Sequence, residues 1–175
     1  MPGSKLMCKW DLPTDFSSRF SPLYLVTNAI LIGLDLYAEG TMYAIHDDVW
    51  NIDDTYVNEY HYCKVIGKNL FNTNCIGGGT GKHSRHIIDN SYFDNGIPHS
   101  ITVRYHNNTF PDSIGDIFIS NSYFNAKVAF SNWGPPTNEL NVYINNCTAE
   151  EIINPFEGEE YHHINVNIYK WSELN

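Results

Sequence analysis

The sequence predicts an all-β fold in which short strands repeat along the chain and stack as a β-solenoid. Three observations predict it. Long helical patterns are missing after about the first 20 residues, because Asn, Gly, Pro, Thr and β-branched residues interrupt nearly every candidate window. Short apolar alternation recurs at a near-regular interval, and the same residue types return to the same place in each repeat. A solenoid needs this combination, because each coil buries its apolar face only against its neighbours.

The repeat is clearest in three segments, HIIDNSYFDN (86–95), IFISNSYFNA (117–126) and VYINNCTAEE (142–151). Asn90, Asn121 and Asn146 define one column. An isoleucine lies two residues before each Asn and a small residue directly follows it: Ile88, Ile119 and Ile144 before, and Ser91, Ser122 and Cys147 after. We expect the isoleucines to stack inside about 4.8 Å apart and the amides to form a ladder at a corner.

The isoleucine column extends toward both ends of the chain. It occupies positions 32, 60, 88, 119, 144 and about 168, with intervals of 28, 28, 31, 25 and about 24 residues. One coil per interval predicts a single-stranded solenoid of about five to six coils. An antiparallel sandwich also repeats short strands, but hairpin signals are scarce, since Asn95-Gly96 is the only Asn-Gly pair.

Each coil carries a second short strand that turns polar at one place. These segments are YAIHDD (43–48), NCIGGGTG (74–81), VRYHNN (103–108), AFSNWG (129–134) and IINPFEG (152–158). Their last buried residues are predicted to be Ile45, Ile76, Tyr105, Phe130 and Ile153. The rows that follow are then His46, Gly77, His106, Ser131 and Asn154; Asp47, Gly78, Asn107, Asn132 and Pro155; and Asp48, Gly79, Asn108, Trp133 and Phe156.

These rows predict a groove for an elongated glycan. The three glycines are expected to leave a depression flanked by two histidines, and the aromatic and amide side chains beside it suit sugar contact. Turns of a solenoid also prefer Asp, Asn and Gly, so a polar row without a ligand is the competing interpretation. A phosphate cradle is disfavoured, because no Gly-Lys-Ser/Thr follows the glycines. The predicted substrate-binding residues are Gly77, Gly78, Gly79, Tyr105, Asn107, Asn108, Asn132 and Trp133.

Four residues are candidates for catalysis: His46, Asp47, Asp48 and His106. His46 with Asp47 or Asp48 could act as a general base on a polysaccharide. A hydrolase pair of either aspartate with Glu157 is disfavoured, because about four coils exceed the roughly 9.5 Å limit for such a pair. The two aspartates could hold Ca²⁺ with backbone oxygens, but a solvated acidic turn is favoured. No cofactor or other metal is predicted.

Residues 24 to 170 resemble the right-handed parallel β-helix of pectate-lyase-like proteins and phage tail spikes. The resemblance rests on the repeat and its Ile and Asn columns. It implies recognition of a polysaccharide or cell-surface glycan, an extracellular or virion-associated location and a homotrimer. A polysaccharide lyase or hydrolase of the same fold and a non-catalytic assembly domain are the alternatives. The calcium and arginine motifs of pectate lyases are not recognisable, so no catalytic residue is carried over from that family.

Composition limits the partners further. With 10 Lys+Arg and 20 Asp+Glu, the formal charge of −10 opposes phosphate backbones and predicts no binding to nucleic acid. No apolar run reaches the roughly 18 residues of a membrane span, which predicts no membrane insertion. The four cysteines have no Cys-x-x-Cys spacing, and two occupy the small-residue column, so buried free thiols are predicted at Cys8, Cys63, Cys75 and Cys147.

One β-helix domain is predicted over residues 24–175. Residues 1–23 are expected to hold a tag remnant, MPGSKL, and an N-terminal cap with a short helix, in which Trp10, Phe16 and Phe20 cover the open end of the solenoid. Five or six coils are few for a self-contained polysaccharide-degrading β-helix, which favours a fragment of a longer protein or an oligomer.

Overall fold

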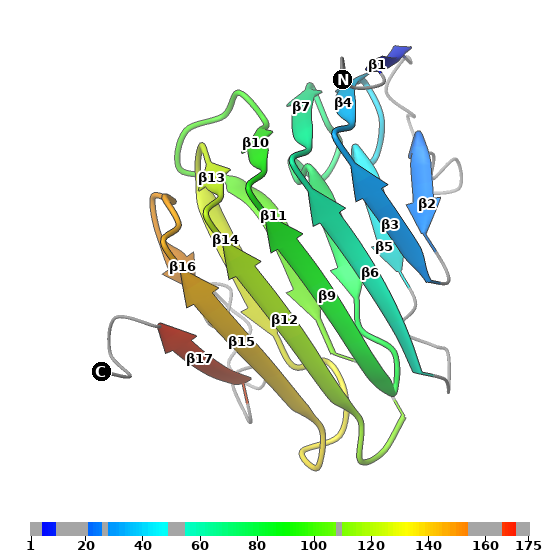
Figure 1. Cartoon of the computed structure of the whole chain (residues 1–175), viewed down its shortest axis with the longest axis vertical. Coiled ribbons are helices and arrows are strands. Elements are labelled where there is room, and N and C mark those ends of the chain that lie inside the picture. The colour runs from blue at the N-terminus through cyan, green and yellow to red at the C-terminus, as the bar shows by residue number, and fades with distance from the viewer. Residues whose placement is uncertain are drawn as a thin grey trace.

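The computed structural model describes residues 5–9, 21–25, 28–48, 55–107, 110–153 and 166–170. These residues form strands and turns, and no helix occurs among them (Figure 1). Lys5–Lys9 forms the first strand, so part of the segment assigned to a tag remnant and cap pairs with the solenoid. The expected cap residues Trp10, Phe16 and Phe20 lie outside the described ranges.

Three parallel sheets make up the solenoid, and every third strand returns to the same sheet. Sheet A contains β1 (Lys5–Lys9), β4 (Asp35–Glu39), β7 (Lys64–Lys68), β10 (Tyr92–Asp94) and β13 (Tyr123–Phe124). Sheet B contains β2 (Leu23–Leu25), β5 (Ile45–Asp48), β8 (Ile76–Gly79), β11 (Ile101–His106), β14 (Lys127–Ser131) and β16 (Ile152–Ile153). Sheet C contains β3 (Ala29–Ile32), β6 (Thr55–His61), β9 (His83–Asp89), β12 (Ile114–Ser120), β15 (Glu139–Asn145) and β17 (Val166–Lys170).

This arrangement confirms the predicted all-β parallel solenoid, with about five coils where five to six were predicted. Figure 1 shows the six strands of sheet C side by side, from β3 in blue to β17 in red. Every strand pair in the described part of the chain is parallel, which excludes the antiparallel sandwich there. A coil has three strands rather than the two that the repeat revealed, because the short strands of sheet A follow the Asn corner directly.

The inward column of sheet C is confirmed in the middle coils and corrected at both ends. Tyr60, Ile88, Ile119 and Ile144 are register partners in successive strands, as predicted. Tyr60 pairs at the other side with Leu31 rather than with position 32, and Ile168 pairs with Val142 rather than with Ile144. In the first coil Gly33 takes the corner position at φ 64°, two residues after Leu31, so Leu31 rather than Ile32 is the inward residue.

The corner after sheet C explains the Asn column. Asn90, Asn121 and Asn146 all have φ between 47° and 49°, the left-handed region that Asn tolerates better than most residues. The Asn146 amide donates to Asn121 Oδ1 at 2.9 Å, which confirms one rung of the predicted ladder. Asn121 in turn donates to Asp89 Oδ1 at 3.3 Å, so a carboxylate rather than Asn90 continues the ladder.

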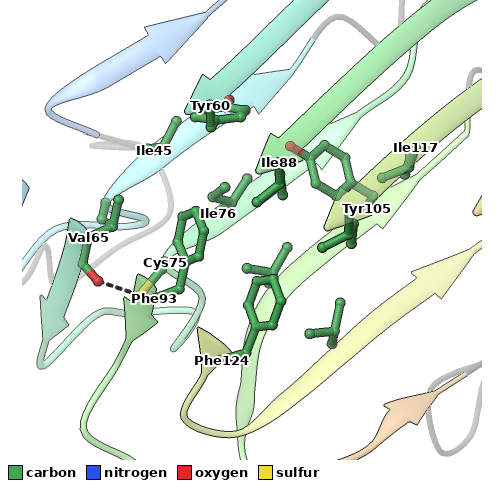
Figure 2. Close-up of a cluster of buried hydrophobic side chains, with 14 of the residues drawn as sticks. Ile45, Tyr60, Val65, Cys75, Ile76, Ile88, Phe93, Tyr105, Ile117 and Phe124 are labelled. Atoms are coloured by element: carbon green, nitrogen blue, oxygen red, sulfur yellow. Dashed lines mark hydrogen bonds between the residues drawn. The ribbon is translucent and has the colours of Figure 1, made fainter. Parts of the chain in front are cut away.

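The core fills the space between the three sheets with side chains that repeat from coil to coil (Figure 2). Ile45 and Ile76 come from sheet B, Ile88 from sheet C, and Phe93 and Phe124 from sheet A. All five are at most 2% exposed, and the two phenylalanine rings stack at 5.4 Å. Repeated burial of like side chains is therefore what sets the register of the coils.

The four cysteines are free thiols, as predicted. Cys63 and Cys75 are buried as predicted, whereas Cys8 and Cys147 are partly exposed, contrary to the prediction. Burial raises the pKa of Cys75 to about 12, so about one molecule in ten thousand carries its thiolate at pH 8. We expect a thiol reagent to modify Cys75 only after unfolding and Cys8 in the native protein, with mass spectrometry identifying the sites. Reaction of native Cys75 at the rate of Cys8 would contradict the packing.

Candidate functional site

The strands of sheet B have a register that differs from the predicted rows. Ile45 pairs with Ile76 as predicted, but the next partners are Val103 and Val128 rather than Tyr105 and Phe130. The prediction took the last apolar residue of each strand as the last buried one. In the coils of β5 and β8 this rule fails, because the next inward positions hold a buried aspartate and a glycine.

The correct register places Asp47, Gly78, Tyr105 and Phe130 in one inward row. It also places His46, Gly77 and Arg104 in one row, and it pairs Gly79 with His106. His46 and His106 therefore do not face each other across the glycines at one level. They lie diagonally, two strands apart and two residues apart along the strand direction.

Asp47 is fully buried and its carboxylate accepts four hydrogen bonds. Asn58 Nδ2 donates to Oδ1 at 2.5 Å, and the hydroxyls of Tyr60 and Tyr105 donate to Oδ2 at 2.7 and 3.0 Å. His86 Nδ1 lies 2.8 Å from the same oxygen and carries the hydrogen, because a carboxylate can only accept. We call these five residues, with Tyr56, the Asp47 network.

The Asp47 network holds its carboxylate ionised. Burial acts to raise the pKa of Asp47, but the charge interaction with His86 and the hydrogen bonds from His86, Tyr60 and Asn58 outweigh it, and the pKa is lowered. Burial and the neighbouring carboxylate raise the pKa of both Tyr60 and Tyr105 well above the usual value. Asp47 is thus a fixed anion with its lone pairs occupied, which makes it a poor general base.

The Asp47 network reaches the turn between sheets B and C through Tyr56. Its hydroxyl lies 3.2 Å from His86 Nε2, donates to Gly79 O at 3.1 Å and accepts from Gly81 N–H at 2.7 Å. Tyr56 and His86 are both buried. The buried contact between Asp47 and His86 therefore helps to position the short turn that follows the glycine strand.

Neighbouring aromatic rings fill the space beside the glycines. A Cβ on Gly77 would lie 2.5 Å from the ring of Tyr43, and a Cβ on Gly78 would lie 2.4 Å from the ring of Tyr105. All residues of β8 are buried. The predicted open depression at Gly77, Gly78 and Gly79 is therefore not formed; the glycines make room for two tyrosines, one on each side of the sheet.

The outer side of sheet B carries two aromatic groups on either side of β8, which we call the aromatic face. His46 contacts Tyr24 at 4.6 Å and Tyr43 at 5.0 Å between ring centroids. Across β8, Trp133 stacks on His106 at 4.2 Å with an interplanar angle of 6°, and the Arg104 guanidinium lies 4.6 Å from the Trp133 ring. Tyr24 is 54% exposed and Trp133 is 43% exposed, so both rings reach solvent.

Two predicted sugar contacts instead hold the Trp133 loop. Asn107 is buried, and its Oδ1 accepts from the backbone N–H groups of Trp133 and Gly134 at 2.9 and 3.1 Å. Asn132 is also buried; its Oδ1 accepts from Gly134 N–H at 2.9 Å, and its amide donates to Asn138 O at 3.3 Å. Both amides thus position Trp133 rather than face solvent. Asn108 lies outside the described residues.

The four catalytic candidates do not meet in one place. His46 and Asp47 are consecutive strand residues, so His46 faces outward while Asp47 faces the core, and the two cannot form a pair. Asp48 ends β5, and its side chain lies outside the described part. Glu157 lies outside it as well. Within the described ranges, no group of three or more His, Cys, Asp or Glu side chains has metal-binding geometry.

Sequence reasoning does not single out His86, Tyr24 or Tyr43 as site residues. For His86 a signal exists, because it occupies an inward column whose next members are Ile117 and Val142. A titratable ring in an apolar column requires a buried partner. Tyr43 gives no comparable signal, since its ring covers a glycine of the next coil.

Comparison with known proteins gives no family assignment: no family model matches the sequence, and no curated protein or solved structure matches it. Among the described residues, no helix has the length and apolar character to cross a membrane. The fold and the aromatic face are therefore the basis for assigning a function.

Proposed function

We propose that this protein binds a glycan along the aromatic face of sheet B. The observation that carries the proposal is Trp133, a large ring held by fixed backbone contacts and still 43% exposed. Sugar rings have apolar faces that pack on indole and phenol rings, and a pre-positioned ring loses little entropy on binding. Exposed tryptophans of this kind are common anchors of binding surfaces.

The layout of the aromatic face suits an elongated ligand. β5 and β11 are two strands apart, and His106 lies two residues further along the strand direction than His46, which places the His46 and Trp133 groups about 12 Å from each other. Arg104, His46 and His106 place polar nitrogen groups beside the rings, which suits hydroxyl or carboxylate groups of a sugar. The stacked strands make these contacts part of a rigid surface, so a chain of sugars can lie across several coils.

Binding without bond cleavage is favoured over a lyase or hydrolase activity. Of the two carboxylates that sequence reasoning paired with His46, that of Asp47 is buried and its lone pairs are occupied by four donors, and the side chain of Asp48 lies outside the described residues. A location outside the cell or on a virion, and a homotrimer, accompany the proposal through the resemblance to pectate-lyase-like and tail-spike β-helices. A domain that only supports assembly is the competing function, and the following experiment separates the two.

Replacing Trp133 with Ala is expected to weaken glycan binding at least about tenfold, because the stacking anchor is lost. A glycan array with acidic and neutral polysaccharides identifies a ligand, and isothermal titration calorimetry measures its affinity for the variants. Tyr123→Ala is the matched control, since Tyr123 is 40% exposed but lies on sheet A. Absence of binding to any glycan, or equal losses in both variants, would overturn the proposal.

A further inference from the structure

A recess of about 430 Å³ lies on the outer side of sheet C, away from the aromatic face. It spans β6, β9 and β12 at their amino-terminal ends, beside the turns that enter the sheet. Its volume is within the range of about 300 to 1,000 Å³ that small-molecule sites occupy. The outward side chains that line it are Thr55, Val57, His83, Arg85, Ile114 and Asp116.

Arg85 is the main charged group of the recess. It is a register partner of both Val57 and Asp116, in the middle of the three strands. Its guanidinium lies 5.4 Å from the ring of Phe118, and the described part of the chain provides no ion pair for it. The planar fork of this side chain is thus held on a ring with its hydrogen-bond donors available.

Asp116 lies beside Arg85, yet its carboxylate is engaged by a different neighbour. Asn141 Nδ2 donates to Asp116 Oδ1 at 3.3 Å, and Asn167 Nδ2 donates to Asn141 Oδ1 at 2.9 Å. The recess therefore presents a cation and, next to it, a hydrogen-bond acceptor. The walls at Val57 and Ile114 are apolar, and Ile114 is 41% exposed.

We propose that this recess binds a sugar acid through its carboxylate. Arg85 matches a carboxylate with two parallel N–H donors, which is the strongest neutralisation that one side chain offers. Asp116 accepts from a ligand hydroxyl, and Thr55 and His83 contact further hydroxyls. Val57 and Ile114 pack on the apolar face of the ring. Phosphate fits less well, because its second negative charge would lie next to Asp116.

An NMR titration of the ¹⁵N-labelled protein with D-glucuronate, D-glucose and inorganic phosphate tests the proposal. We expect glucuronate to shift the amide signals of residues 55–57, 83–85 and 114–116, and glucose and phosphate to leave them unchanged at the same millimolar concentration. Arg85→Gln is expected to weaken glucuronate binding at least about tenfold, with Arg85→Lys between the two.

Arg104→Gln, on the aromatic face, is the matched control and is expected to leave the affinity at these amides unchanged. The amide spectra of all variants also report whether each is folded. The proposal is wrong if glucuronate does not shift these signals, if glucose or phosphate shifts them equally, or if Arg85→Gln binds as well as the original protein. It does not depend on glycan binding at Trp133, because the two sites lie on different sheets and have separate variants.

Discussion

Asp47→Asn is expected to lower the free energy of unfolding by about 3 to 5 kcal/mol, a large share of the roughly 5 to 15 kcal/mol that stabilises a domain. Four donors point at the carboxylate, and an amide offers one oxygen and an NH₂ group that would face donors. His86 Nδ1 would also lose the buried carboxylate to which it donates. Denaturant unfolding followed by circular dichroism measures the change.

Asp112→Asn is the matched control, because Asp112 is exposed and its φ of 60° suits Asn. It is expected to change stability by no more than about 0.5 kcal/mol. Equal effects of the two substitutions would mean that the Asp47 network contributes nothing specific.

The pH dependence of the free energy of unfolding tests the same variant in a second way. Because folding lowers the pKa of Asp47, its contribution is fully present above the usual carboxyl pKa of about 3.9 and is lost as pH falls through the lower folded value. The original protein should therefore lose more stability than Asp47→Asn as the pH drops below about 4. An identical acid profile for both would show that another carboxylate controls acid unfolding.

Gly78→Ala is expected to cost about 2 to 4 kcal/mol, since the new Cβ would meet both the Tyr105 ring at 2.4 Å and the Asp47 carbonyl oxygen at 3.1 Å. Tyr105 is fully buried and cannot move aside without giving up its hydrogen bond to Asp47. Thermal and denaturant unfolding measure the loss. Gly78→Ala adds a single methyl group, so it is the smallest substitution with a large predicted effect on stability.

Gly77→Ala provides the comparison within the same strand. Its Cβ would meet Tyr43 at 2.5 Å, but that ring lies on the outer side and is only partly buried, so moving it gives up a part-buried hydrogen bond from Asn72 rather than a fully buried one to Asp47. We expect a loss below about 1.5 kcal/mol. If Gly77→Ala costs as much as Gly78→Ala, the backbone of β8 rather than the tyrosine contacts limits what this strand accepts.

The fold was predictable from sequence because one coil resembles the next. Ile88, Ile119 and Ile144 share an environment, and Asn90, Asn121 and Asn146 share a backbone angle, so both columns appear in the sequence itself. The predicted column is wrong by one residue in the first coil, where Gly33 rather than Asn occupies the corner and Leu31 rather than Ile32 faces the core. The right-handed sense of the coil remains a prediction from the resemblance.

The candidate site was less predictable, for a specific reason. Asp47 looks like a surface residue in sequence, because only its partners from other coils make its burial favourable. Those partners come from strands 11 to 58 residues away, and no local pattern reports them. Trp133 was identified correctly as an exposed aromatic residue. Asn107 and Asn132 were predicted to contact sugar from their residue type, but both are buried and hold the loop of Trp133.

The small size of Gly78 has a consequence for how the whole solenoid unfolds. In an array of repeats, each unit ordinarily contacts only the units before and after it, so the ends can fray one unit at a time. Here Tyr105 reaches across the strand of Gly78 to bond Asp47, which belongs to the coil before that strand. Three successive coils are thereby coupled beyond nearest neighbours, and this segment should open as a single cooperative unit.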